Sequence, residues 1–157
     1  MWEIGRLAFC LLLCFAAAGL GGLFTGSGIG SGWYESLHKP GWTPPAWVFG
    51  PVWTVLYILM AVSLWLVWKR TGWREGKIAL TLFGSQLVLN AFWSFFFFYL
   101  RSPAWGLAEL VCLWALIAAT LYAFLHARTW AGVILVPYLA WVTFAGVLNY
   151  AIWRLNA

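Results

Sequence analysis

Long apolar runs, separated by short groups of glycine, proline or charged residues, make up most of this chain. Five such runs cover residues 4–24, 44–68, 78–100, 103–125 and 130–153. Each is close to the length of about 20 residues that an α-helix needs to cross a bilayer. None shows the alternation of about ten residues that is typical of a membrane β-strand. The pattern predicts an all-α integral membrane protein, a bundle of five transmembrane helices that forms one domain over residues 1–157.

The composition points to lipid around most of the surface. Hydrophobic residues make up 64% of the 157 residues and charged residues only 8%, whereas a soluble domain has roughly a quarter charged residues. So few charges cannot cover a surface that faces water. Arg6 and the alanines 16–18 give the first run some features of a secretory signal peptide. Its apolar stretch continues to Phe24, however, which favours a retained first helix.

The basic residues fall mostly on one side of the predicted bundle. With five spans, the N-terminus and the loops 69–77 and 126–129 share the side that carries Arg6, Lys69, Arg70, Arg74, Lys77 and Arg128. The opposite side carries Lys39, Arg101 and Arg154. The more basic side of a bacterial inner-membrane protein faces the cytoplasm, which predicts a bacterial membrane protein with a cytoplasmic N-terminus. The net charge of +5 is spread over short loops, so no nucleic-acid partner is expected.

The first long connection, residues 25–43, is rich in aromatic residues and prolines. The segment WYESLHKPGWTPPAW, from Trp33 to Trp47, carries three tryptophans and three prolines together with His38 and Lys39. Prolines lower the conformational entropy that a loop loses when it becomes ordered. We therefore expect residues 25–43, here called the lid loop, to fold over the end of the bundle.

Polar and aromatic side chains form stripes on three of the predicted helices. Residues three or four positions apart share one face of an α-helix. The stripes consist of Gln86, Asn90, Trp93 and Phe97, beside Ser94, on the third helix; Phe49, Trp53 and Tyr57 on the second; and Trp141, Ala145 and Asn149 on the fifth.

These stripes share one half of the membrane, beneath the lid loop. At about 1.5 Å per residue, Trp53, Asn90 and Trp141 are expected ~14, ~15 and ~18 Å below the surface on that side. Trp93 and Asn149 are expected at ~10 and ~6 Å. Aromatic walls, a few amides and a covering loop are typical of a ligand pocket.

Structural roles for the same residues remain open at this point. Trp93 and Trp141 are too deep for the interfacial tryptophan belt, so each is either a core residue or a pocket wall. Asn90 and Gln86 either face a ligand or hydrogen-bond a neighbouring helix. Glu109, in the fourth helix, is expected to snorkel to the surface or to cap a neighbour rather than to act in catalysis.

Other familiar site chemistry is missing from the sequence. Cys10, Cys14 and Cys112 all fall inside apolar runs and are expected to be small buried residues. No other histidine or cysteine is placed to build a metal site with His38. The sequence has no serine–histidine–acid pattern, phosphate loop or paired carboxylates, which argues against a conventional hydrolase or a nucleotide-driven pump. No chain of ionisable residues crosses the bundle, which argues against proton-coupled transport.

Three long segments resemble the TspO/MBR family, the tryptophan-rich sensory proteins that include the mitochondrial translocator protein. They are WYESLHKPGWTPPAWVFGPVWTVLY (33–57), QLVLNAFWSFFFF (86–98) and WAGVILVPYLAWVTFAGVLNYAIWRLN (130–156). The resemblance extends over all five predicted spans in order. It implies a five-helix membrane bundle, often dimeric, that needs no obligatory cofactor. The implied ligands are porphyrins such as protoporphyrin IX, sterols, and benzodiazepine- or isoquinoline-type drugs.

The resemblance also implies roles for particular residues. By position, the ligand pocket would consist of Tyr34, Pro44, Trp53, Tyr57, Asn90, Trp93, Ser94, Trp141, Ala145 and Leu148. In bacterial relatives, the tryptophans that match Trp53 and Trp141 are linked to light- and oxygen-dependent breakdown of protoporphyrin IX, which would make them catalytic residues. We further expect His38 and Lys39 to meet the two propionates of a bound porphyrin at the membrane surface.

Two further expectations concern sterols and a second copy of the chain. Leu148, Tyr150 and Arg154 fit the L/V-x-Y-x-R pattern proposed for cholesterol, a weak motif. Small residues that would support a homodimer are Ala18 and Gly22 on the first helix and Gly84 and Ala91 on the third. The function predicted from all of this is a membrane receptor for porphyrins and other hydrophobic ligands, with porphyrin degradation and transport of tetrapyrroles or lipids as the alternatives.

Overall fold

The computed structural model describes residues 2–157, apart from the side chain of Trp2. The elements are α1 (Trp2–Gly30), α2 (Trp33–Ser36), α3 (Ala46–Ser94), the π-helical turn η1 (Phe95–Tyr99), α4 (Pro103–Ala127) and α5 (Thr129–Asn156). Within residues 2–157 the chain forms no β-strand. The prediction of an all-α protein is therefore confirmed.

Four helical segments among the described residues are long and apolar enough to cross a membrane. They cover Glu3–Gly30, Ala46–Tyr99, Pro103–Ala127 and Thr129–Asn156. Large apolar side chains point outward from them, among them Ile4, Leu23 and Ile78, each about three-quarters exposed. An outer surface of this kind suits lipid and indicates a multi-pass membrane protein.

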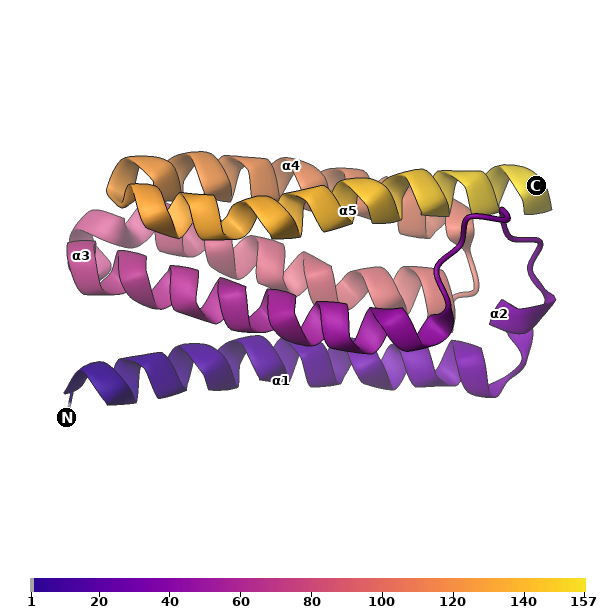
Figure 1. The fold of residues 1–157 in the computed structure, drawn as a ribbon, viewed down its shortest axis with the longest axis horizontal. Helices are drawn as coiled ribbons and strands as arrows, with labels where there is room; N and C mark the ends of the chain where they lie inside the picture. The colour runs from indigo at the N-terminus through magenta and orange to yellow at the C-terminus, as the bar shows by residue number, and fades with distance from the viewer. Residues whose placement is uncertain (1) are drawn as a thin grey trace.

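α3 contains the first correction to the predicted boundaries. The sequence predicts a loop at residues 69–77, but the chain is helical on both sides of Gly72, which has φ 67° and ψ −170°. Glycine adopts this backbone conformation without the steric cost that a side chain would add. The chain reverses there, and the two halves of α3 run side by side in opposite directions (Figure 1).

α1 continues to Gly30, so the prediction that it ends at residue 24 is wrong. Two of the glycines in α1 lie where the helix approaches its neighbours closely. A Cβ at Gly28 would lie only 2.8 Å from the Cβ of Phe98, and one at Gly21 would lie 3.5 Å from the Ser94 hydroxyl. Small residues allow membrane helices to approach this closely. The lid loop is correspondingly shorter than predicted and spans residues 31–45, with α2 inside it.

α4 and α5 are close to their predicted positions and extend a few residues further. α4 starts at Pro103, where the lack of a backbone N–H costs nothing, and the Ser102 hydroxyl accepts a hydrogen bond from the Trp105 N–H at 3.3 Å. α5 continues through Pro137 to Asn156. The turn between α4 and α5, the Gly72 turn and the N-terminal end of α1 lie at one end of the bundle; α2 and the C-terminus lie at the other (Figure 1).

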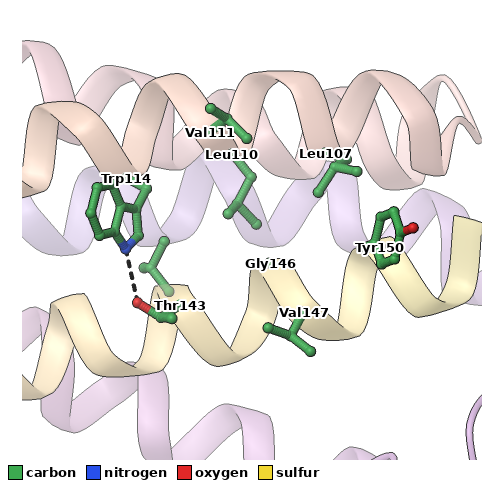
Figure 2. A pocket seen from close by; sticks show the side chains of 9 residues that line it. Leu107, Leu110, Val111, Trp114, Thr143, Gly146, Val147 and Tyr150 are labelled. Atoms are coloured by element: carbon green, nitrogen blue, oxygen red, sulfur yellow. Dashed lines mark hydrogen bonds between the residues drawn. The ribbon is translucent and has the colours of Figure 1, made fainter.

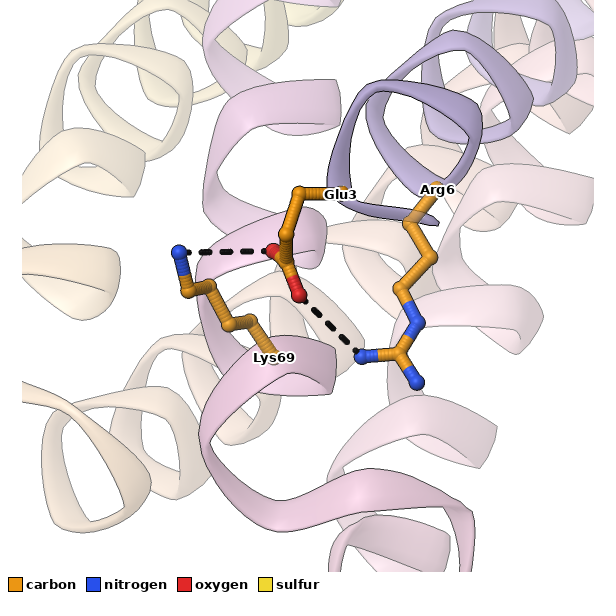
Figure 3. A network of polar contacts seen from close by, with 3 residues as sticks. All are labelled: Glu3, Arg6 and Lys69. Carbon is orange, nitrogen blue, oxygen red and sulfur yellow. Dashed lines mark ion pairs between the residues drawn. The ribbon is translucent and has the colours of Figure 1, made fainter. Parts of the chain in front are cut away.

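An ion-pair network joins α1 to α3 at the N-terminal end (Figure 3). The Glu3 carboxylate lies 3.3 Å from the Lys69 ammonium and 3.6 Å from the Arg6 guanidinium. These side chains are about 40% exposed, so solvent screens the attraction and each pair contributes little to stability. The network marks the polar boundary of this end of the bundle.

Burial separates the predicted small residues into two groups. Cys10 and Cys14 are fully buried in the core, as predicted, whereas Cys112 is exposed on the outer face of α4, so the prediction for it is wrong.

Ala91 is only 3% exposed and packs next to Gly21 of α1. It is therefore used in packing within this chain and is not available to a second copy. Gly22, by contrast, is exposed.

Candidate functional site

A chain of buried hydrogen bonds crosses the interior between the two halves of α3 and α5. The Tyr57 hydroxyl donates to Oδ1 of Asn90, and Nδ2 of Asn90 donates to the Tyr138 hydroxyl at 2.9 Å. The Tyr138 hydroxyl in turn donates to Oε1 of Gln86 at 2.8 Å. Asn90 and Gln86 therefore hydrogen-bond neighbouring helical segments, which was one of the two roles that the sequence left open.

Tyr138 is the member of this hydrogen-bond network that the sequence analysis does not identify. It is 1% exposed and lies at the centre of the network. A signal was present, because Tyr138 lies three residues before Trp141, a helical step that keeps it on the same face as the fifth-helix stripe. A stripe that is counted only in steps of four, from Trp141 to Ala145 and Asn149, does not include Tyr138.

A second set of bonds fixes Trp93 nearer the lid end. Its indole N–H donates to Oδ1 of Asn149 at 3.3 Å, and Nδ2 of Asn149 donates to the Pro103 carbonyl at 2.7 Å. The Trp93 ring also stacks on Phe97, with 5.2 Å between the ring centroids. Trp93 is thus held as a packing residue that ties α3 to α5 and, through Asn149, to the start of α4.

Aromatic rings continue from this interior toward the lid loop. Trp53 packs on Tyr57 with a centroid distance of 5.7 Å and on Tyr138 with 6.4 Å. Trp141 packs on Phe144 at 5.3 Å, and Phe144 contacts Trp42 of the lid loop at 5.9 Å. Indole and phenyl rings in such edge-to-face and tilted contacts present large apolar surfaces at low entropic cost.

α2 seats the lid loop on η1. The Tyr34 ring lies 5.5 Å from that of Phe98, and the Trp33 ring 5.7 Å from that of Phe97. Burial, together with the nearby charge of Glu35, raises the pKa of the Tyr34 phenol above its usual value. Tyr34 is therefore neutral around physiological pH and can act as a hydrogen-bond donor.

Lys39 is tied to the lid loop itself. Its ammonium donates to the backbone carbonyls of Tyr34 at 2.5 Å, Leu37 at 3.2 Å and Glu35 at 3.4 Å, and it lies 4.6 Å from the Tyr34 ring centroid. These bonds satisfy carbonyls at the end of α2. A ligand carboxylate that approaches Lys39 would have to compete with them, whereas the exposed His38 side chain is not engaged in this way.

The C-terminal turn of α5 holds the lid loop closed. The His38 backbone N–H donates to Oδ1 of Asn156 at 2.9 Å, and Nδ2 of Asn156 donates to the His38 carbonyl at 2.9 Å. This pair of bonds links positions 118 residues apart. The loop is therefore tied to the end of α5 that lies at the C-terminus.

We expect Asn156→Ala to loosen the lid loop without unfolding the bundle. Loss of both bonds to His38 should raise local opening of residues 37–43 about tenfold, since each bond contributes about 0.5–1.5 kcal/mol. Hydrogen exchange of the lid-loop amides in detergent would measure the change. Ser27→Ala is the control, because the Ser27 hydroxyl bonds only within α1. Unchanged exchange in Asn156→Ala would mean that the contacts of α2 alone hold the loop.

The remaining predicted binding residues are spread over more than one environment. Tyr57, Asn90, Ser94 and Leu148 are buried in the packed interior; Trp53, Ala145 and Pro44 are half-buried. The Ser94 hydroxyl accepts a hydrogen bond from Thr25 of α1 at 3.2 Å. The hydrogen bond to Thr25 places Ser94 on the α1 side of α3.

The three residues of the sterol motif do not form one surface. Leu148 is 5% exposed and packs with Phe97 and Phe98 in the interior, whereas Tyr150 is 51% exposed. Arg154 is also exposed and lies one helical turn after Tyr150. A ligand on the outer face of α5 would contact Tyr150 and Arg154 but not Leu148.

Glu109 differs from its prediction. It is only 8% exposed, so it does not snorkel, and within the described residues neither carboxyl oxygen has a hydrogen-bond partner. Burial of an unpaired carboxyl costs stability. Groups of three or more histidine, cysteine or acidic side chains that could hold a metal are absent from the described part of the chain.

Two open grooves flank α5. One lies between the first half of α3 and α5, has a volume of about 620 Å³, and is lined by Pro51, Val52, Val55, Leu56, Leu59, Pro137, Ala140, Trp141 and Phe144. The other, between α4 and α5, has a volume of about 330 Å³ (Figure 2). Trp141 is the predicted site residue that lines the first groove, and it also packs against the interior core cluster.

Comparison with known proteins shows the family of the chain. The model of the TspO/MBR family matches residues 10–154. The tryptophan-rich protein TspO of Chlorobaculum tepidum is 44% identical over 156 residues, which cover 98% of each chain. The translocator protein of Homo sapiens is 43% identical over 141 residues, 86% of this chain and 83% of that protein. The tryptophan-rich sensory protein of Cereibacter sphaeroides is 44% identical over 124 residues, 79% of this chain and 77% of that protein. The chain therefore belongs to the TspO/MBR family.

Proposed function

We propose that this protein is a five-span membrane receptor that binds porphyrins, chiefly protoporphyrin IX, beneath the lid loop. Sterols and benzodiazepine-type drugs are the further ligands that we propose for the same interior. The observation that carries the proposal is the packing of Trp53 on Tyr57 and Tyr138, whose hydroxyls hydrogen-bond the Asn90 amide, below a loop that is tied to Asn156. Such rings provide flat apolar walls for a planar macrocycle.

The five spans follow if each half of α3 crosses the membrane. The halves lie antiparallel on either side of Gly72 (Figure 1), and α1, α4 and α5 supply the other three crossings. The end that holds the Gly72 turn then carries the larger share of the basic residues, which supports a cytoplasmic N-terminus in a bacterium. A homodimer remains part of the proposal, with the exposed Gly22 of α1 as a candidate contact.

The charged end of the ligand would lie at the lid loop. A porphyrin with two propionates keeps its carboxylates near water while its ring enters the apolar interior. His38 is exposed at this level, and Lys39 is beside it with its ammonium on backbone carbonyls. Exchange of one of those carbonyls for a propionate oxygen would replace a neutral hydrogen bond by a charge-assisted one.

The test is a titration in the dark with protoporphyrin IX and with an uncharged drug-like ligand, on the wild type and on the double variant His38→Ala/Lys39→Ala. We expect saturable binding of both ligands to the wild type. The double variant should bind porphyrin about threefold to fivefold more weakly and the uncharged ligand less than about twofold more weakly, as for the loss of one partly exposed charge pair. Equal losses would contradict the propionate contact, and no saturable porphyrin binding to the wild type would contradict the receptor.

Light- and oxygen-dependent degradation of porphyrin is the second function that we propose, with Trp53 and Trp141 as the reactive residues. The specific observation is that Trp141 is held only by packing. Its indole nitrogen has no hydrogen-bond partner among the described residues, and Phe49 and Phe144 contact its ring. An indole in an apolar setting beside a bound macrocycle is placed to donate an electron to the excited ring.

Transport is the alternative to both functions. Flux of porphyrin across the membrane of vesicles that contain the protein would identify a transporter.

A further inference from the structure

The groove between the first half of α3 and α5 differs from the α4–α5 groove in size and in how the tryptophan that lines it is held. Its volume of about 620 Å³ is within the range of small-molecule sites, and its nine lining residues include no charged side chain. Three of them, Val52, Leu56 and Trp141, also belong to the interior core cluster or pack against it. Of these three, Trp141 is the one that also belongs to the proposed binding set.

The Trp141 indole makes no hydrogen bond that would hold it in place. Its Nε1 atom is buried and has no acceptor among the described residues. The ring is retained by Phe49, with a centroid distance of 5.8 Å, and by Phe144 at 5.3 Å. Rotation of the Trp141 side chain would therefore break no hydrogen bond. It would lose packing against Phe49 and Phe144, which contacts with a flat apolar ligand can replace.

The tryptophan in the other groove is held differently. Nε1 of Trp114 donates to the Thr143 hydroxyl at 2.8 Å, across the space between α4 and α5 (Figure 2). In an apolar environment that bond resists rotation of the Trp114 ring, because a freed N–H finds no replacement acceptor in lipid. Two grooves of the same helix thus contain one anchored and one unanchored tryptophan.

The walls of the α3–α5 groove also contain a proline on each side. Pro51 of α3 and Pro137 of α5 both line it. Proline has no N–H to donate to the carbonyl four residues earlier, so each helix lacks one of its own hydrogen bonds at this level. Missing bonds of this kind make bending easier, and here they occur on the two segments that would have to separate.

We propose that the α3–α5 groove is a lateral entrance, through which a planar apolar ligand of the tetrapyrrole class passes from the lipid into the interior, with Trp141 as its gate. This inference rests on the proposed receptor function and adds a route to it. Such a ligand concentrates in the bilayer before it meets the protein. The ordered lid loop, bonded to Asn156, closes the alternative path from water.

The test compares two lipid-facing substitutions, one in each groove. Ala140→Phe narrows the α3–α5 groove, and Val147→Phe narrows the α4–α5 groove; both positions are exposed in the structure, and neither belongs to the proposed binding set. Protein in lipid nanodiscs would be mixed with vesicles loaded with protoporphyrin IX, and tryptophan quenching would be followed over time. A residue that lines an entrance changes the free-energy barrier to passage of the ligand but not the free energies of the free and bound states. The association and dissociation rate constants should therefore fall by the same factor.

We expect Ala140→Phe to slow association and dissociation about fivefold each, with an unchanged dissociation constant, and Val147→Phe to slow them less than about twofold. Equal slowing by both variants, as for a groove that merely holds lipid chains, would overturn the entrance. A loss of affinity with unchanged association would overturn it as well, by making the groove part of the binding site. Wild-type protein without saturable binding would overturn the receptor and the entrance together, whereas saturable binding with no effect of Ala140→Phe would overturn the entrance alone.

Discussion

Trp141→Phe is expected to bind protoporphyrin IX in the dark within about threefold of the wild-type affinity, yet to lose at least about tenfold of the rate of light-driven porphyrin loss. Phenylalanine keeps an aromatic ring against Phe49 and Phe144. No hydrogen bond is lost, because Nε1 of Trp141 has no partner in the described residues, so the cost in binding is limited to part of the packing area. A phenyl ring is far harder to oxidise than an indole, so the photochemical step should fail.

The measurement is the decay of the porphyrin absorption band under illumination in air, with samples first matched for bound porphyrin. Trp114→Phe is the matched control: it removes an indole that lines the α4–α5 groove, and it should degrade porphyrin at the wild-type rate. Equal decay in Trp141→Phe and the wild type would rule out Trp141 as the reactive group. Equal slowing in both variants would mean that the loss of rate is not specific to Trp141.

The length of the apolar runs predicts where the membrane-spanning helices lie, but it does not predict the residues at which they end. Runs of membrane length locate α4 and α5 to within three residues and α1 except for its last six residues, because backbone in lipid must satisfy its hydrogen bonds by continuing the helix. The segment 69–77 contains Lys, Arg, Glu and two glycines, a composition that suits a loop. Lys, Arg and Glu are also good helix formers, so the helix continues through them and only Gly72 departs from it.

The candidate site was predictable as far as side-chain periodicity reaches. Spacing of three and four places Trp53, Tyr57 and Asn90 on faces that meet in the structure, because interior helices have few ways to bury polar groups. Periodicity does not carry the conformation of the lid loop, so the bonds from Lys39 to backbone carbonyls could not be foreseen. Nor does it show which polar groups pair, as the unpaired carboxyl of Glu109 demonstrates.

Asn90→Ala is expected to lower the free energy of unfolding by about 2–3 kcal/mol. Asn90 accepts from the Tyr57 hydroxyl and donates to the Tyr138 hydroxyl, so its loss leaves Tyr57 with a buried donor and opens a small cavity. Hydrogen bonds between membrane helices contribute about 0.6 kcal/mol on average, and the cavity accounts for most of the remainder. Reversible denaturation in mixed detergent micelles would measure the change.

Tyr57→Phe separates the hydrogen bond from the cavity at the same place. It removes the Tyr57 hydroxyl but keeps the ring that packs on Trp53, so it should cost about 0.6 kcal/mol, the average of one such bond. Because Asn90 is engaged on both sides by tyrosines, its first role is to join the two halves of α3 to α5. A variant Asn90→Ala that is as stable as the wild type, but binds porphyrin more than about tenfold more weakly, would contradict this and make the amide primarily a ligand-binding group.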